Sequence, residues 1–264
     1  MIGHNHLGKN GRFGNQMFQY AVTRGIAAKH NYDWCIPDGP KTDDEFEDEE
    51  NQHKLFMAFN MGGVKVVNMH PAPYKKEGSF TFDQDLFDNC EDNVNLYGYF
   101  QSEKYFKHIE DEIRKDFEWR DDVKKLCQEM FDSIGGKAIS LHIRRTDYTV
   151  NNNHPLQPMS YYEDALKLFD KNVQILVFSD DPKWCQEQEL FADDSVMISE
   201  GNDADIDLCL MTKCDYHIIA NSSFSWWGAW LGDSEKVVAP SNWFADSCAG
   251  KSVKDMEFSD WTWV

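Results

Sequence analysis

The stretch AISLHIRRTDY at residues 138–148 decides the fold of this chain and gives the first indication of its function. Apolar side chains alternate along its first half without a glycine or proline, a pattern that predicts a buried β-strand. The end of that strand carries a run of polar residues: His142, Arg144, Arg145 and Asp147. A guanidinium matches phosphate or carboxylate in geometry and is almost never buried without a partner, so this strand end predicts an anion site. A structural network, for example between Arg145 and Asp147, is the alternative.

The composition indicates a globular protein and narrows its partners. The chain has 264 residues, of which 41% are hydrophobic, enough for one large domain or two small ones with a core. Its formal net charge of -20 argues against non-specific binding to nucleic acid or to an anionic membrane. An acidic protein that binds an anion must do so with a few local cations, which focuses attention on Arg144 and Arg145.

Cysteine usage and hydropathy predict a cytoplasmic protein. The seven cysteines are scattered, odd in number and include no C-x-x-C, so zinc and redox motifs are not expected and a reducing compartment fits best. Residues 1–14 contain no apolar core of signal-peptide length, and no run reaches 18 apolar residues. We therefore expect no membrane insertion.

The first half of the chain begins with a glycine-rich turn, GKNGRFGN at residues 8–15, that leads into a helix at 16–30. Backbone N–H groups at such a helix start can bind an anion, although a simple turn is the commoner explanation. The acidic run at 38–50 is expected to be a solvated loop. The other predicted elements are strands at 33–36 and 64–68, a loop at 70–78 and helices at 102–117 and 121–134. Gly135 and Gly136 then suggest a domain boundary between residues 1–135 and 136–264.

The second half alternates strands with helices, which implies a parallel sheet wound as a Rossmann-like half. Beyond the opening stretch, strands are predicted at 173–178, 196–198, 216–220 and 237–239. Ser160 and Glu163 form a potential capping box for a helix to about 170, and Pro182 should begin another. Further helices are predicted at 203–213 and 224–231, the second with a tryptophan-rich core face. The aromatic tail at 258–264 is expected to pack on a neighbouring surface.

Polar residues follow three of these strands, at 142–147, 179–181 and 221–223. Because parallel strands share a direction, all three segments should meet at one edge of the sheet, where ligands bind in open α/β sheets. This makes an anion site more probable than a structural network. Ser222 or Ser223 could cap the last helix and also contact a phosphate. Capping explains Asp203 but not Asp207, which lies one turn inside its helix.

Four blocks of this sequence resemble glycosyltransferase family 11, whose members are α-1,2-fucosyltransferases related more distantly to α-1,6- and protein O-fucosyltransferases. The blocks are GRFGNQMFQYA at 11–21, HIRRTDY at 142–148, FSDD at 178–181 and IIANSSFSWWGAWL at 218–231. They occur in the family's order, and the last is very specific. Residues 38–91 contain no block that can be matched, and Thr146 replaces the family's more usual glycine.

The resemblance implies an α/β, GT-B-like architecture with two Rossmann-like halves facing a cleft. Residues 1–135 would form the acceptor-side half, and residues 136–264 the half that binds GDP-fucose. It also implies inversion at the sugar and no required metal or other cofactor. The expected acceptor is a glycan, most simply the 2-hydroxyl of a galactoside.

The resemblance also implies roles for individual residues. Arg144 and Arg145 would bind the β-phosphate as catalytic cations, and Asp147 is a candidate for the general base. The remaining substrate-binding candidates are Arg12, Gly14, Asn15, His142, Asp180, Asp207, Ser222 and Ser223, with Asp207 reading the guanine N–H edge. Three alternatives stay open: a fucosyltransferase of other linkage or acceptor, a transferase of another nucleotide sugar, and a catalytically silent binding module.

Overall fold

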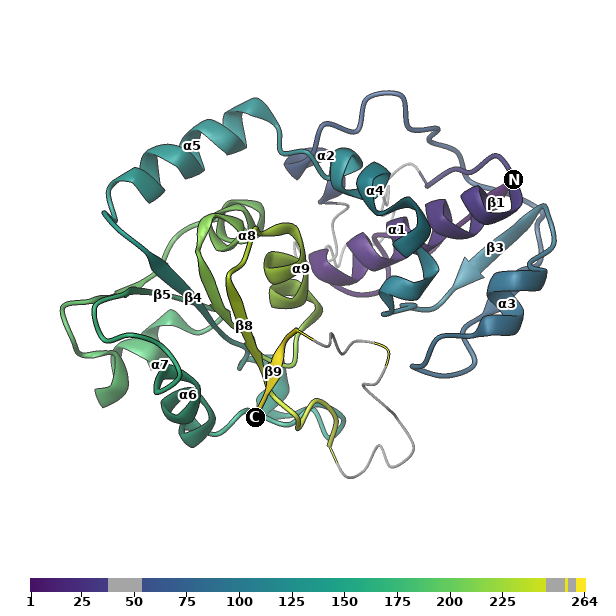
Figure 1. Ribbon diagram of the computed structural model, residues 1–264. Coiled ribbons are helices and arrows are strands. Elements are labelled where there is room, and N and C mark those ends of the chain that lie inside the picture. The colour runs from purple at the N-terminus through teal and green to yellow at the C-terminus, as the bar shows by residue number, and fades with distance from the viewer. Residues whose placement is uncertain (38–53, 246–254, 256–259) are drawn as a thin grey trace, which may run out of the picture. The chain divides into compact units, whose positions relative to one another are not determined.

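The computed structural model describes residues 1–37, 54–245, 255 and 260–264, which form two compact units (Figure 1). Unit 1 comprises residues 1–120 and 251–257, and unit 2 comprises residues 121–250 and 258–264. The acidic run predicted to be a solvated loop lies outside the described residues.

Unit 1 is built on a small parallel sheet with strand order β1-β3-β2. The strands are β1 (Ile2–Gly3), β2 (Tyr74–Lys76) and β3 (Val94–Tyr97). The helices are α1 (Phe13–His30), α2 (Leu55–Ala58), α3 (Gln84–Asn89) and α4 (Glu110–Asp116), with 3-10 turns at Glu103–Tyr105 and Lys107–Ile109. Helix α1 is buried along most of its length, which explains Gly25: a Cβ there would lie 2.1 Å from the carbonyl oxygen of Tyr105.

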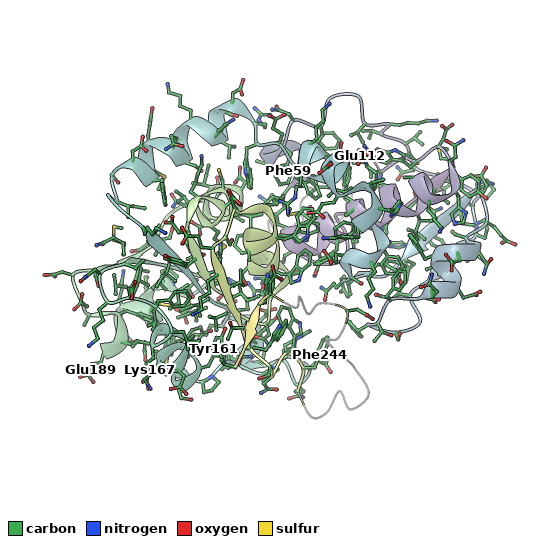
Figure 2. All side chains as sticks on the ribbon, viewed as in Figure 1. Phe59, Glu112, Tyr161, Lys167, Glu189 and Phe244 are labelled. Atoms are coloured by element: carbon green, nitrogen blue, oxygen red, sulfur yellow. The ribbon has the colours of Figure 1, made fainter. Side chains whose placement is uncertain are left out.

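An aromatic cluster forms the core of unit 1 at the end of α2. The ring of Phe59, labelled in Figure 2, lies 4.7 Å from Trp119, 4.9 Å from Phe117 and 5.8 Å from Phe13, measured between centroids. Such rings bury large apolar areas, so they stabilise a unit whose sheet is small.

Several sequence-based predictions for unit 1 need correction. The segments 33–36 and 64–68 form only isolated bridges, Ile2 with Trp34 and Ile36 with Val66. The predicted loop at 70–78 contains strand β2, and the predicted helix at 102–117 is two 3-10 turns followed by α4. For β2 the short-range pattern was a poor guide, because pairing with β3, distant in sequence, decides the conformation.

Unit 2 contains a six-stranded, fully parallel sheet with strand order β6-β5-β4-β7-β8-β9. Its strands are β4 (Ala138–Ile143), β5 (Gln174–Ser179), β6 (Val196–Ile198), β7 (Tyr216–Ile218), β8 (Lys236–Ala239) and β9 (Thr262–Trp263). Strand β4 is central and buried at every residue, as the opening stretch predicted. The aromatic tail does pack on a neighbour, and it does so as strand β9 beside β8.

Helices cover both faces of this sheet (Figure 1). They are α5 (Asp121–Asp132), α6 (Met159–Leu166), α7 (Pro182–Gln186), α8 (Ala204–Lys213) and α9 (Ser223–Leu231). In Figure 1, α8 and α9 lie on one side of the sheet and α6 and α7 on the other. From α6, Tyr161 (Figure 2) donates its hydroxyl to the carbonyl oxygen of Ile219 at 2.6 Å, anchoring the helix to the sheet edge.

The helices of unit 2 confirm one sequence-based prediction and correct another. The tryptophans of α9 are buried core residues, as expected: Trp226, Trp227 and Trp230. The predicted capping box is wrong, because α6 begins at Met159 after Pro158 and places Ser160 inside the helix without a side-chain cap.

Helix α5 belongs to unit 2, so the units divide before α5 rather than at Gly135 and Gly136. The reason is that α5 packs on α8, where the Cys127 thiol donates to the carbonyl oxygen of Ile206 at 3.6 Å. Gly135 and Gly136 lie in the short connection between α5 and β4.

Candidate active site

Asp180 connects the ends of β4 and β5, two neighbouring strands of unit 2. It follows β5, whose last residue, Ser179, pairs with Ile143 of β4. Its Oδ1 accepts the backbone N–H of Arg145 at 2.8 Å, and its Oδ2 accepts that of Thr146 at 3.1 Å, while the Thr146 hydroxyl donates to the same oxygen. Burial raises the pKa of Asp180, but the Arg144 guanidinium and these donors outweigh burial and lower it, so the carboxylate stays ionised.

Arg144 is held between two carboxylates. Its Nη1 lies 3.0 Å from Asp180 Oδ2, and its Nη2 lies 2.6 Å from Asp147 Oδ1. The ring of Tyr148 lies 5.5 Å from the guanidinium carbon, and the Tyr148 hydroxyl donates to the carbonyl oxygen of Asn221 at 3.0 Å. Thus the arginine–carboxylate network considered as an alternative is present, with Arg144 in place of Arg145 as the partner of Asp147.

Arg145 has different surroundings from Arg144. Both arginines follow the end of β4, and the Arg145 side chain reaches toward α7. Its Nε lies 3.1 Å from Asp181 Oδ2, and its guanidinium carbon lies 4.2 Å from the centroid of the Trp184 ring. A cavity of about 230 Å³ borders Arg144, Arg145 and Trp184. The two arginines, expected to act together on one phosphate, therefore lie in separate contact networks.

His142 lies in the interior between β4 and α9. Its Nδ1 lies 2.8 Å from the hydroxyl oxygen of Ser225, and its ring centroid lies 5.6 Å from that of Phe224. Burial lowers the pKa of His142 to about 3, so the ring is neutral at physiological pH. The sequence analysis missed Ser225, although its place two residues after Ser223 in the α9 block was a usable signal.

The start of α9 brings Ser222 and Ser223 to the same sheet edge. Ser222 is the N-cap, and its hydroxyl accepts the backbone N–H of Phe224 at 3.3 Å, as capping predicted. Ser223 is the first residue of the helix. This helix end follows β7, which pairs with β4, so it lies at the edge occupied by Arg144.

Asp207 lies in a third polar group at this edge, next to the end of β6. The Ser199 hydroxyl donates to Asp207 Oδ1 at 2.6 Å, and Asn202 Nδ2 donates to it at 3.2 Å. Burial raises the pKa of Asp207 to about 6, despite these hydrogen bonds. The sequence analysis missed Ser199 and Asn202, although Ser199 follows a predicted strand and fits the strand-end rule.

The remaining predicted residues, Arg12, Gly14 and Asn15, lie in unit 1. The glycine-rich turn is shorter than predicted, because α1 begins at Phe13 with Arg12 as its N-cap. Gly14 and Asn15 therefore form part of the first helical turn. Asn15 Oδ1 accepts a hydrogen bond from Gln101 Nε2 at 2.7 Å, which connects α1 to the segment after β3.

Polar side chains also follow each strand of unit 1, which the sequence analysis did not anticipate. Glu77, after β2, accepts the backbone N–H groups of Tyr99 and Phe100, each at 2.8 Å. His4, after β1, places Nε2 3.1 Å from the carbonyl oxygen of Gly98. Burial raises the pKa of Glu77 and lowers that of His4 to about 4. Both side chains are thus hydrogen-bonded to the backbone of residues 98–100, which follow β3.

Two further observations concern the described residues only. Within them, no group of three or more His, Cys, Asp or Glu side chains is placed to hold a metal ion. In the same ranges, no helix is long and apolar enough to cross a membrane.

Comparison with solved structures identifies the fold. Residues of both units align with the α-1,6-fucosyltransferase NodZ, in a crystal soaked with GDP-fucose, at a TM-score of 0.55 and 14% identity, over 88% of this chain and 92% of that one. They also align with POFUT1 in complex with GDP at a TM-score of 0.57 and 13% identity, over 90% and 97% of the two chains. The α/β, GT-B-like fold class predicted from sequence is therefore confirmed.

Comparison of sequences identifies the family. The chain is 31% identical to an α-1,2-colitosyltransferase of Escherichia coli over 89% of its length and 90% of that protein. It is also 31% identical to the O-antigen biosynthesis glycosyltransferase WbnK of Escherichia coli, over 93% and 97%, and 22% identical to galactoside α-(1,2)-fucosyltransferase 1 of Bos taurus, over 90% and 69%. The model of glycosyl transferase family 11 matches residues 65–264. The chain thus belongs to glycosyl transferase family 11 and is a glycosyltransferase.

Proposed function

We propose that this enzyme transfers fucose from GDP-fucose to the 2-hydroxyl of a galactoside, with inversion at the sugar and without a metal. The observation that carries the proposal is the fixed guanidinium of Arg144 at the strand-end edge of unit 2, held by Asp180. The α-1,2 linkage is supported by the names of the relatives in Escherichia coli and Bos taurus. The GDP moiety is supported by the structural neighbours, whose titles name GDP-fucose and GDP.

The charge of Arg144 explains how such a reaction would be accelerated. Breaking the bond between the fucose C1 and the phosphate oxygen leaves extra negative charge on GDP and oxocarbenium character on the sugar. A fixed cation at the β-phosphate stabilises that charge more in the transition state than in the ground state. In this proposal Arg144 supplies the electrostatic stabilisation that a metal ion supplies in other transferases.

The other residues at this edge suit the rest of the nucleotide. Asp207, with an oxygen that accepts hydrogen bonds, would accept the N–H edge of guanine. The N-terminus of α9, with Ser222 and Ser223, would donate to the diphosphate. His142 is neutral and buried, so it would contribute shape and a hydrogen bond, not charge. The role of Asp147 as general base stays a prediction.

Unit 1 would then bind the acceptor. A glycan is neutral and rich in hydroxyl groups, and unit 1 offers neutral side chains after β1 (His4) and at the start of α1 (Asn15), with one partly buried carboxylate, Glu77, after β2. Arg12, at the start of α1, would lie at this acceptor-side edge. The assignment of the acceptor to this unit extends the prediction made for residues 1–135.

A second donor deserves a direct test because one relative is named a colitosyltransferase. Colitose lacks one hydroxyl that fucose carries. A site built to hydrogen-bond that hydroxyl rejects the analogue lacking it by as much as about 10⁴- to 10⁵-fold, whereas an apolar site discriminates weakly. The ratio of the transfer rates with the two donors therefore shows whether the site hydrogen-bonds that hydroxyl or surrounds its position with apolar groups.

The experiment combines both donors with a panel of β-galactosides. Product linkage and anomeric configuration are read by NMR, and donor hydrolysis is followed without acceptor. We expect an α-1,2-linked product from GDP-fucose. A different linkage, or a preference for GDP-colitose, would correct the acceptor or the donor. GDP-fucose binding without transfer or hydrolysis would identify a silent binding module, and equal affinity for GDP, UDP and ADP would refute the proposed guanine site.

A further inference from the structure

The two carboxylates on Arg144 differ in how firmly each is held. The Asp180 side chain is 17% exposed and accepts the N–H groups of Arg145 and Thr146 in addition to its ion pair. The Asp147 side chain is 43% exposed and, among the described residues, pairs with Arg144 as its only cation. The guanidinium itself is only 13% exposed, so its position is fixed even if one partner leaves.

The charge of this cluster matters for any anion that binds there. Arg144 and Arg145 supply two positive charges, and Asp147, Asp180 and Asp181 supply three negative ones, so the sum is 2 − 3 = −1. At contact distances near a protein surface, like charges repel by several kcal/mol. A diphosphate would therefore approach a cluster that is already net negative unless one carboxylate moves away.

Only Asp147 can leave at low cost. Moving Asp180 would break its ion pair with Arg144 and remove the acceptor of the part-buried N–H of Arg145, and an unsatisfied buried donor costs about 1–3 kcal/mol. Asp181 is also engaged, because it pairs with Arg145 and its Oδ1 caps α7 by accepting the N–H of Trp184 at 3.2 Å. The Asp147 side chain is 43% exposed and its Oδ1 makes no hydrogen bond, so, among the described residues, only the ion pair with Arg144 holds this carboxylate in place.

We propose that Asp147 is an exchangeable counter-ion of Arg144, displaced when the donor's phosphate binds, whereas Asp180 is the positioning residue that keeps the guanidinium in place. The identity of the phosphate as part of GDP rests on the proposed function. Before the donor binds, Asp147 Oδ1 forms an ion pair with Nη2 of Arg144. After exchange, the phosphate contacts Nη2 in place of Asp147, while Nη1 remains paired with Asp180. Asp180 thus orients the guanidinium and leaves Nη2 available to the phosphate.

The test is calorimetric titration with GDP and, separately, with inorganic pyrophosphate. Four forms of the full chain are compared: wild type, Asp147→Asn, Asp180→Asn and Asp164→Asn. Asp164 is the matched control, because its exposed carboxylate pairs with Lys167 (Figure 2) at 2.7 Å in the same i,i+3 spacing as Asp147 with Arg144. Asp164→Asn thus makes the same change of charge on the exterior of α6.

Removal of a competing exposed partner should tighten binding by about two- to fivefold, which corresponds to an exposed ion pair. We expect this for Asp147→Asn, with a lower donor KM. Asp180→Asn should weaken binding by more than about tenfold, and Asp164→Asn should change nothing. Because Asp147 is exposed, its variant should fold even if Asp180→Asn does not.

Weaker or unchanged binding by Asp147→Asn would overturn the proposal. In particular, a lower kcat with unchanged affinity would identify Asp147 as the general base. Tighter binding of pyrophosphate by Asp147→Asn, in a protein that shows no preference for GDP, would support the exchange and refute the proposed donor instead.

Discussion

The two parallel sheets of this enzyme carry polar residues after their strands, but the chemistry at the two edges differs. In unit 2 the edge is ionic: Arg144 and Arg145 are fixed by Asp147, Asp180 and Asp181. In unit 1 the edge is mostly neutral, with His4 and Asn15 and one carboxylate, Glu77, bonded to backbone N–H groups. Under the proposed function, the strand-end edge of unit 2 would bind an anion, and that of unit 1 would bind the neutral hydroxyl groups of a glycan.

The difference indicates how a strongly acidic chain can use an anionic donor. The cations are few and concentrated at one sheet edge, where ion pairs hold them in place. Unit 1 needs no such cations if its ligand is a glycan. The variants below test this contrast, from the largest expected effect to the smallest.

Replacing Arg144 should have the largest effect on the transfer reaction proposed for the ionic edge of unit 2. We expect Arg144→Ala to lower kcat by about 100- to 1000-fold, or about 2.7–4 kcal/mol in transition-state stabilisation, because no other described residue replaces the guanidinium there. Rates of transfer are compared with those of Lys167→Ala, an exposed cation on α6. A folded Arg144→Ala enzyme with turnover near that of wild type would show that the ionic edge is purely structural.

Asp207→Asn should reduce nucleotide selectivity while stabilising the protein. Loss of the charged acceptor should weaken GDP binding by about 10- to 100-fold and leave ADP binding unchanged. The pKa of Asp207 is raised from 3.8 to about 6, so its stabilising contribution is present below pH 4 and is lost as the pH rises through 6.

At pH 7.5 the buried charge of Asp207 therefore costs at most about 3 kcal/mol, which the amide would recover in part. Thermal unfolding of the wild type and Asp207→Asn at pH 4.5 and 7.5 measures this. A stability difference that does not grow with pH would contradict it.

Glu77→Gln should damage unit 1 without affecting the nucleotide. The carboxylate accepts two backbone N–H groups with separate oxygens, and an amide offers only one acceptor. The stranded N–H of Tyr99 or Phe100 should cost about 1–3 kcal/mol in the free energy of unfolding. Chemical denaturation measures the loss, and GDP titration is the control. A change in GDP affinity would remove the functional contrast between the two edges.

Ser222→Ala should have the smallest effect on stability. Loss of the N-cap of α9 typically costs about 1 kcal/mol. If the Ser222 hydroxyl also contacts the diphosphate, Ser222→Ala should lower GDP affinity several-fold. Ser222→Asn can still cap α9, so it should keep the stability of the wild type but lose GDP affinity. Equal GDP affinity in both variants and the wild type would restrict Ser222 to capping.

Sequence reasoning worked best where local pattern and long-range pairing agree. The alternating run that forms β4, the helix after Pro182 and the capped start of α9 were all predicted near their observed bounds. It failed where a partner strand decides the conformation, as for β2 inside a predicted loop. It also failed at Ser160, which lies inside α6 because that helix begins at Met159.

For the candidate site, the sequence by itself determined which residues meet. Strands β4, β5 and β7 are parallel and adjacent, so the polar segments that follow them must share an edge, and the directionality of the chain is enough to predict this. Three of the four family blocks, at 142–148, 178–181 and 218–231, contain residues of that edge, whereas the block at 11–21 lies in unit 1.

Only the tertiary structure decided which partner each charge takes. Arg144 and Arg145 are neighbours in sequence, but in the segment after β4 they have different partners, Asp147 and Asp180 for the first and Asp181 with Trp184 for the second. Pairing depends on distances of a few ångströms and on burial, and neither can be calculated from spacing along the chain. That is why the opening stretch predicted an anion site, while the distinction between a fixed and an exchangeable carboxylate emerged from the fold.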